Sequence, residues 1–141
     1  MIVFFDTSAM VKRYIAEPDS GAVIELWNNA SLIAASQLLY AEMIATFARK
    51  LREEPKNADK ITHLQQAFRG DFQTLTRIAV DDDVHRRVDD ILGRHPLRGA
   101  DAVHLASATL VNDVLQEQVT FACADAKLVA AARAEGLSVE P

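Results

Sequence analysis

The segment Ile2-Val3-Phe4-Phe5-Asp6 decides the fold, because it sets an unbroken apolar run directly before a carboxylate. Such a run is typical of a parallel strand that is covered on both faces. Residues 119–124 (VTFACA) repeat the pattern and are followed by Asp125. Ligands bind at the carboxyl ends of parallel strands in open α/β sheets, so Asp6 and Asp125 are expected to face one crevice.

Strand and helix patterns alternate along the rest of the chain. Strands are predicted at residues 2–5, 32–35, 75–80, 119–123 and 137–139. The helices between them include residues 58–72 and 126–134, and a long helix that runs from an N-cap at Ser36 to about Glu53. This alternation predicts an α/β fold of three layers, α/β/α, with a central parallel sheet.

Composition indicates one globular domain over residues 1–141, because half of the residues are apolar and only 5 are Gly and 4 Pro. No apolar run reaches the ~18–20 residues of a membrane span, and the first residues lack a basic leader, so we expect a cytoplasmic protein without membrane contact. Cys123 is the single cysteine and is predicted to fill the core. The net charge of −5 argues against binding of nucleic acid by bulk electrostatics, so any RNA contact must be local.

Four acids are the candidate site residues: Asp6, Glu42, Asp101 and Asp125. Asp101 opens a helix, and Glu42 lies on a largely apolar helical stripe where a carboxylate needs a partner. Converging carboxylates repel one another unless a cation holds them, and oxygen ligands without a His or Cys pair favour Mg²⁺ or Mn²⁺. The predicted chemistry is metal-assisted phosphodiester hydrolysis, with Ser8 orienting a water or a carboxylate.

Each of these residues also suits a purely structural role. Thr7 or Ser8 caps the first helix equally well, and Asp125 has the position of an N-cap for the last helix. Glu42 has a possible ion-pair partner in Arg49, two turns further along its helix.

Two other groups resemble sites and are interpreted as structural. Asp81-Asp82-Asp83 follows an apolar run, but adjacent acids more often cap a helix. His104 lies one turn after Asp101 and is within reach of a substrate phosphate, yet a lone helical histidine is usually structural. The remaining histidines have no zinc-ligand spacing: His63, His85 and His95.

Four segments that span nearly the whole chain resemble the PIN-domain ribonucleases, and within them the VapC-type toxins of prokaryotic toxin–antitoxin pairs. The most specific segment is residues 97–106 (LRGADAVHLA). The others are the first strand ending in Asp6-Thr7-Ser8, residues 38–43 (LLYAEM), and residues 121–125 (FACAD) followed by Leu128.

The resemblance implies a PIN-like fold and a Mg²⁺- or Mn²⁺-dependent endoribonuclease. Its metal-binding quartet corresponds to Asp6, Glu42, Asp101 and Asp125, with Ser8 as the polar helper. The resemblance also implies an RNA substrate, a homodimer and a cognate antitoxin. The chain departs from the family at Cys123, where many members carry a hydroxyl residue.

Two functions of other classes remain open at this point. Asp6 after an apolar strand also suits the nucleophile of a phosphatase or receiver domain, although Ser8 stands where such a phosphatase has a second Asp. A catalytically silent PIN-like module that binds RNA or protein is the third possibility. The early helices carry more apolar residues than one sheet-facing stripe requires, which suggests a groove for a partner helix: Val11, Tyr14, Ile15, Leu26 and Trp27.

Overall fold

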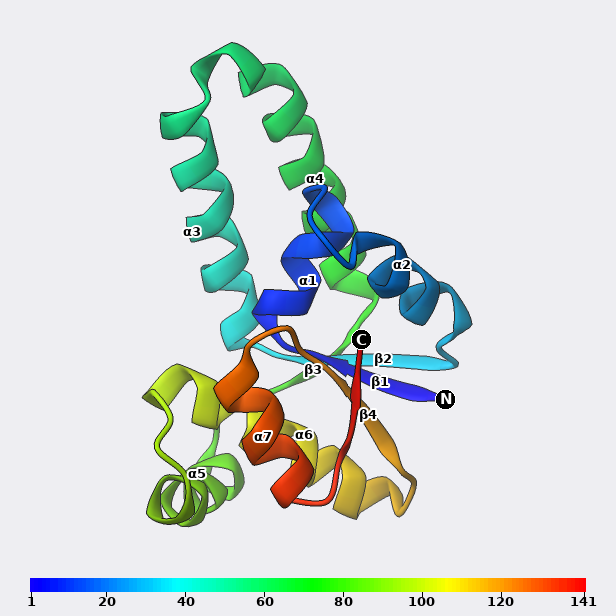
Figure 1. Cartoon of the computed structure of the whole chain (residues 1–141), viewed down its shortest axis with the longest axis vertical. Helices are drawn as coiled ribbons and strands as arrows, with labels where there is room; N and C mark the ends of the chain where they lie inside the picture. Colours follow the sequence, from blue (N-terminus) through cyan, green and yellow to red (C-terminus); the bar gives the residue numbers. More distant parts are fainter.

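The computed structural model describes all residues 1–141 and has three layers (Figure 1). A five-stranded parallel sheet has the order β3-β2-β1-β4-β5 and confirms the predicted fold class. Its strands are β1 (Ile2–Phe5), β2 (Leu32–Ser36), β3 (Thr76–Ile78), β4 (Val119–Ala122) and β5 (Ser138–Glu140). The chain passes from β1 to β2 on one side and reaches β4 on the other, so the topological switch point lies between β1 and β4.

Strand β1 is buried on both faces, as its uninterrupted apolar sequence predicts. Ile2 and Phe4 face one hydrophobic core, while Val3 and Phe5 face a second core on the other side. The first core lies under α5 (Asp82–Arg94), α6 (Gly99–Leu115) and α7 (Ala126–Ala134). Two cores separated by one sheet are what helices on both faces require.

The opposite face is covered by α1 (Thr7–Tyr14), α2 (Ser20–Asn29), α3 (Leu38–Glu53) and α4 (Ala58–Thr74). Helices α3 and α4 form a hairpin that extends beyond the rest of the molecule (Figure 1). The 3₁₀ turn η1 (Pro55–Asn57) joins them, because Pro55 lacks the N–H that would continue α3. No helix combines the length and the hydropathy that a membrane span requires.

Several predicted boundaries are wrong by one or two residues for local reasons. Ser36 is the last residue of β2 rather than the N-cap of α3, which is Gln37. Strand β3 is only three residues long, because this edge strand pairs with β2 alone. Strand β5 begins after Leu137, whose N–H donates to the carbonyl of Ala132 in the last turn of α7.

Candidate active site

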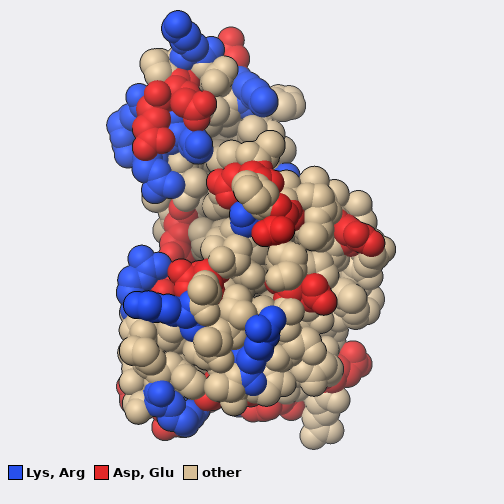
Figure 2. Space-filling view, in the orientation of Figure 1, with Lys and Arg blue, Asp and Glu red and all other residues tan.

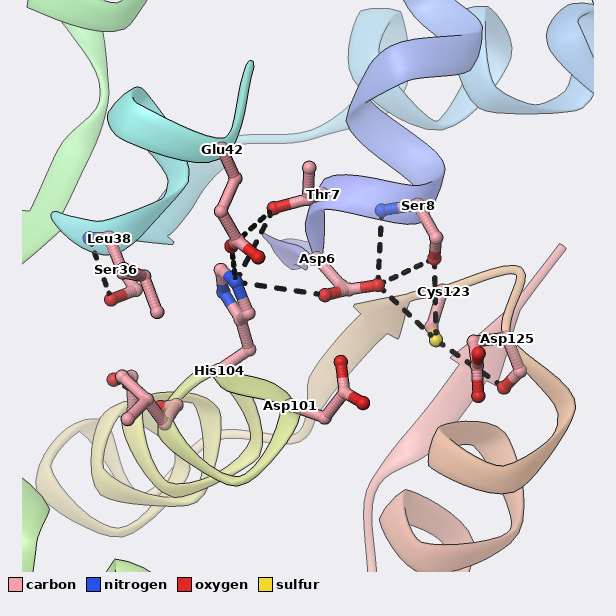
Figure 3. Close-up of polar contacts among 12 residues, drawn as sticks. Asp6, Thr7, Ser8, Ser36, Leu38, Glu42, Asp101, His104, Cys123 and Asp125 are labelled. Atoms are coloured by element: carbon pink, nitrogen blue, oxygen red, sulfur yellow. Dashed lines mark hydrogen bonds and ion pairs between the residues drawn. The ribbon is translucent and has the colours of Figure 1, made fainter. Parts of the chain in front are cut away.

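Four helix starts supply the four acids. Asp6 is the N-cap of α1, Asp125 is the N-cap of α7, Asp101 lies in the first turn of α6, and Glu42 lies near the start of α3. The carboxylates of Asp6, Glu42 and Asp101 point toward a common space, with Asp125 to one side beyond Cys123 (Figure 3). The positive ends of helix dipoles stabilise anions, so this arrangement offsets part of the repulsion among the acids.

Asp6 is almost fully buried and uses only one of its two carboxylate oxygens within the protein. Its Oδ2 accepts hydrogen bonds from the Ser8 N–H at 3.1 Å, the Ser8 hydroxyl at 2.5 Å and the Cys123 thiol at 3.6 Å. Its Oδ1 accepts no hydrogen bond, and the nearest basic nitrogen is His104 Nε2 at 3.9 Å. One oxygen is therefore fixed and the other is open.

Glu42 is held in the same one-sided way. Its Oε1 accepts a hydrogen bond from the Thr7 hydroxyl at 2.9 Å and also contacts Nε2 of His104 (Figure 3). Burial alone would raise the pKa of Glu42, but the hydrogen bonds from His104 and Thr7 outweigh burial and lower it below its ordinary value.

His104 shows the complementary shift. Burial alone would lower the pKa of its imidazole, but the hydrogen bond with Glu42 and the charge of Asp6 outweigh burial and raise it. The pKa shifts of Glu42 and His104 share one cause, which is the hydrogen bond between the two side chains.

Asp101 and Asp125 each keep one oxygen without a protein partner. Asp101 Oδ2 accepts from Nε of Arg98 at 3.1 Å, and Asp125 Oδ1 accepts from the Leu128 N–H at 3.0 Å. Asp101 Oδ1 and Asp125 Oδ2 form no hydrogen bonds within the protein. Each of the four acids therefore keeps one unbonded oxygen, three of them at the common space and that of Asp125 to one side (Figure 3).

The acids do not form a closed cluster: no three His, Cys, Asp or Glu side chains lie close enough together to make a complete metal-binding group. Two of the four are turned toward basic neighbours, Glu42 toward the imidazole of His104 and Asp101 toward the guanidinium of Arg98. The donor set consists of carboxylate oxygens, which fits a hard cation such as Mg²⁺ or Mn²⁺ better than zinc or copper.

Neither the ion pair of Glu42 with Arg49 nor the cap by Thr7 or Ser8 is present. Arg49 lies against Glu53 instead of Glu42, because Glu42 is already engaged across the sheet edge with residues of α1 and α6. The first helix is capped by Asp6, whose extended backbone angles let its own carboxylate reach the free N–H of the first turn. Both of these alternative structural roles are therefore excluded.

Helix capping by Asp81 and Asp125 is confirmed. The carboxylate of Asp81 accepts from the N–H groups of Asp83 and Val84 and starts α5, as expected for an acidic helix start. Asp125 is the N-cap of α7, and this capping uses only its Oδ1. A capping role and a metal-binding role are therefore compatible at Asp125.

Sequence reasoning missed the environment of His104, which was interpreted as structural. The spacing of Asp101 and His104, three residues apart on one helix, was the available signal, because it places both side chains on the same face. Cys123 is buried as predicted. Burial, with the nearby charge of Asp6, raises the pKa of its thiol to about 12, so the thiol stays protonated and donates to Asp6.

Known proteins share this fold and sequence. Residues 3–132 match the PIN domain family. The chain is 33% identical to "Ribonuclease VapC45" from Mycobacterium tuberculosis, over 99% of this chain and 95% of that protein. A toxin–antitoxin complex from Klebsiella pneumoniae contains a chain with a TM-score of 0.66 and 19% identity, over 91% of this chain and 90% of that one.

The structure of FitAcB from Neisseria gonorrhoeae is similar over 99% of this chain and 96% of that chain, with a TM-score of 0.73 at 18% identity. At this identity the likeness shows the fold alone. The family match covers most of the chain, including all four acids. The chain therefore belongs to the PIN domain family.

Proposed function

We propose that this protein is an endoribonuclease that uses Mg²⁺ or Mn²⁺ to hydrolyse RNA phosphodiester bonds, and that it acts as the toxin of a toxin–antitoxin pair. One observation carries the catalytic proposal. Asp6, Glu42 and Asp101 point toward one space with Asp125 to one side of it (Figure 3), and each of the four acids keeps an oxygen without a protein partner. The family and the similar protein named a ribonuclease support the reaction class.

The side chains have distinct parts in the proposed reaction. Asp6, Glu42, Asp101 and Asp125 would hold the metal ion, which supplies Lewis-acid activation of a phosphodiester when bound. Ser8 fixes Asp6 through Oδ2, and so directs the other oxygen of that carboxylate into the site. Arg98 engages only Oδ2 of Asp101, so this carboxylate would still have an oxygen for the cation.

Arg98 is the cation best placed to meet the RNA. Its side chain is 81% exposed, and only its Nε is engaged, with Asp101. The charges of Asp125 and Glu42 act on the same guanidinium. Acidic side chains lie in the notch below the α3–α4 hairpin, with Lys and Arg side chains on its lower edge (Figure 2). A local contact of this kind suits a chain whose net charge is −5.

The two other functions gain no support. Receiver domains of the flavodoxin-like class have the strand order 2-1-3-4-5, whereas this sheet has the order 3-2-1-4-5. No second acid stands beside Asp6 for a phosphatase mechanism, because Ser8 occupies that place and bonds to Asp6. A silent module would not need four acids with open oxygens.

We further propose a cognate antitoxin and a homodimer as partners, supported for the antitoxin by the similar chain in a toxin–antitoxin complex. A groove between α1 and the α3–α4 hairpin suits a partner helix. It is lined by Tyr14, Ile15, Ala16, Lys50, Glu54, Asn57, Lys60, Ile61 and Leu64. The remaining apolar residues of the early helices, Val11, Leu26 and Trp27, are partly buried against the core.

Purified protein incubated with structured and single-stranded RNA tests the catalytic proposal. Cleavage should require Mg²⁺ or Mn²⁺ and should stop in EDTA, while a small phosphate ester under the same conditions should remain intact. Robust RNA cleavage in EDTA would contradict metal dependence, and hydrolysis of the ester without RNA cleavage would favour the phosphatase.

A further inference from the structure

The two oxygens of Glu42 differ in their surroundings. Oε1 receives the Thr7 hydroxyl at 2.9 Å and Nε2 of His104, whereas Oε2 has no hydrogen-bond partner in the protein. These donors come from the starts of α1 and α6, far apart in sequence (Figure 3). The carboxylate is therefore held from two sides through one atom.

The imidazole of His104 is itself fixed in place. It is fully buried, and Nε2 also lies 3.3 Å from the Thr7 hydroxyl. Nε2 carries a proton in the charged ring and in one of the two neutral tautomers, and in both of these forms it donates to Glu42 Oε1.

The other ring nitrogen, Nδ1, makes a histidine at position 104 unfavourable for the stability of the fold. Nδ1 of His104 is buried without any hydrogen-bond partner. Burying an unpaired polar atom costs free energy that an apolar side chain at this place in α6 would not incur. The contacts of the ring with Glu42 and Thr7 are its only hydrogen bonds, and Asp6 is a further charged neighbour at 3.9 Å.

We propose that His104 and Thr7 are positioning residues that hold Glu42 by Oε1 and thereby leave Oε2 as the atom that ligates the metal ion. This inference rests on the proposed metal-dependent function. Asp6 repeats the arrangement, since Ser8 and Cys123 hold its Oδ2 and leave Oδ1 open. Partners that orient a ligand from behind are worth about 10–100-fold in metal affinity.

Mn²⁺ binding to metal-free protein, measured by calorimetry, tests the role of His104 with two amide substitutions. Glutamine can place its NH₂ group near the position of the histidine Nε2, whereas the shorter asparagine cannot reach Glu42. We expect His104→Asn to weaken Mn²⁺ binding by about 10–100-fold. His104→Gln should stay within about 3-fold of the wild type, because it restores the donor.

Ser107→Ala is the matched control. Ser107 is fully buried on the same helix, and its hydroxyl donates only to the carbonyl of Val103 in its own helix. This substitution should leave Mn²⁺ affinity unchanged. A general loosening of α6 would instead weaken binding in Ser107→Ala and His104→Asn alike, and that result would overturn the proposal.

Thr7 gives a second and independent pair of variants. Thr7→Val removes the hydroxyl at nearly constant shape and should weaken Mn²⁺ binding, whereas Thr7→Ser keeps the donor and should not. In a Glu42→Gln background, His104→Asn should have no further effect on Mn²⁺ affinity, because the two residues act through one ligand. Additive losses in the double variant would contradict the proposal.

The outcomes separate this inference from the proposed function. Wild-type protein that neither binds Mn²⁺ nor cleaves RNA would overturn both. Wild-type protein that does both, while His104→Asn and Thr7→Val bind Mn²⁺ normally, would overturn only the positioning role. If His104→Asn does not fold, the Thr7 pair decides the question.

Discussion

Glu42 and Glu135 each contact a histidine, yet they differ in how many of their carboxylate oxygens accept hydrogen bonds. Arg94 donates to both oxygens of Glu135, at 2.6 Å and 3.1 Å, and His95 contacts Oε2 at 2.8 Å. Glu42 has donors on Oε1 alone. Glu135 joins the end of α5 to the end of α7 and has no oxygen to spare.

Arg94 and Arg98 likewise differ in how many of their guanidinium nitrogens are engaged within the protein. Arg94 is engaged through Nε and Nη2 with one carboxylate, whereas Arg98 uses Nε alone and keeps both terminal nitrogens free of protein partners. Charged side chains that are fully paired hold the fold together, while those with unused atoms are available to a ligand.

The largest expected effect comes from exchanging each glutamate for glutamine. Glu42→Gln should reduce RNA cleavage by more than about 100-fold, since loss of a ligand exceeds the ~10–100-fold cost of losing a residue behind it. Glu135→Gln should leave the cleavage rate unchanged. Single-turnover cleavage assays of both variants measure this, and equal activities would break the comparison.

Asp101→Asn tests whether a carboxylate that keeps one oxygen free of hydrogen bonds binds the metal ion. We expect cleavage to be lost, and the rise in melting temperature that Mg²⁺ gives the wild type should be smaller, because binding stabilises only a native state with an intact site. Without metal, the melting temperature should not fall, since removing one charge relieves repulsion among the acids. Thermal melts in EDTA and in Mg²⁺ are the measurement. A destabilised variant that still cleaves RNA would identify Asp101 as structural.

Arg98→Gln sharpens the comparison between the two arginines. Loss of one phosphate contact should raise the KM for RNA by roughly 10-fold with less effect on kcat, and should reduce the salt dependence of binding. Arg94→Gln removes the same charge from a guanidinium that is already committed to Glu135, and is the control. Equal increases in KM for both variants would show that only net charge matters.

The smallest expected effect is on the pH dependence of the stability that Glu135 contributes. Hydrogen bonds from Arg94 lower the pKa of Glu135, so its stabilising contribution is present above the unfolded value of about 4.5 and is lost as pH falls through the lower folded value. Glu135→Gln should lower the melting temperature at pH 7 by roughly 2–5 °C. The difference in melting temperature between the wild type and Glu135→Gln should disappear as the pH drops below about 4.5. A gap that persists at pH 2–3 would point to packing.

Much of the fold was predictable because its signals are local. The apolar runs of β1 and β4 indicated buried parallel strands, and their ends placed Asp6 and Asp125 at one edge of the sheet. The acidic start of α5 was predictable for the same reason, since a cap bonds to the turn that follows it. Boundaries at the edge strands were less predictable, because their length depends on a neighbouring strand.

The three layers, the four candidate acids and the family resemblance were predictable from the sequence. Hydrophobic periodicity and short motifs are local properties of the chain and need no knowledge of the fold. The tertiary fold brings Glu42 into contact with His104, 62 residues away, rather than with Arg49 on its own helix. It also sets which oxygen of each acid stays open. Such contacts depend on how distant helix starts meet at the switch point of the sheet, and the spacing of residues along one chain does not encode side-chain direction across that gap.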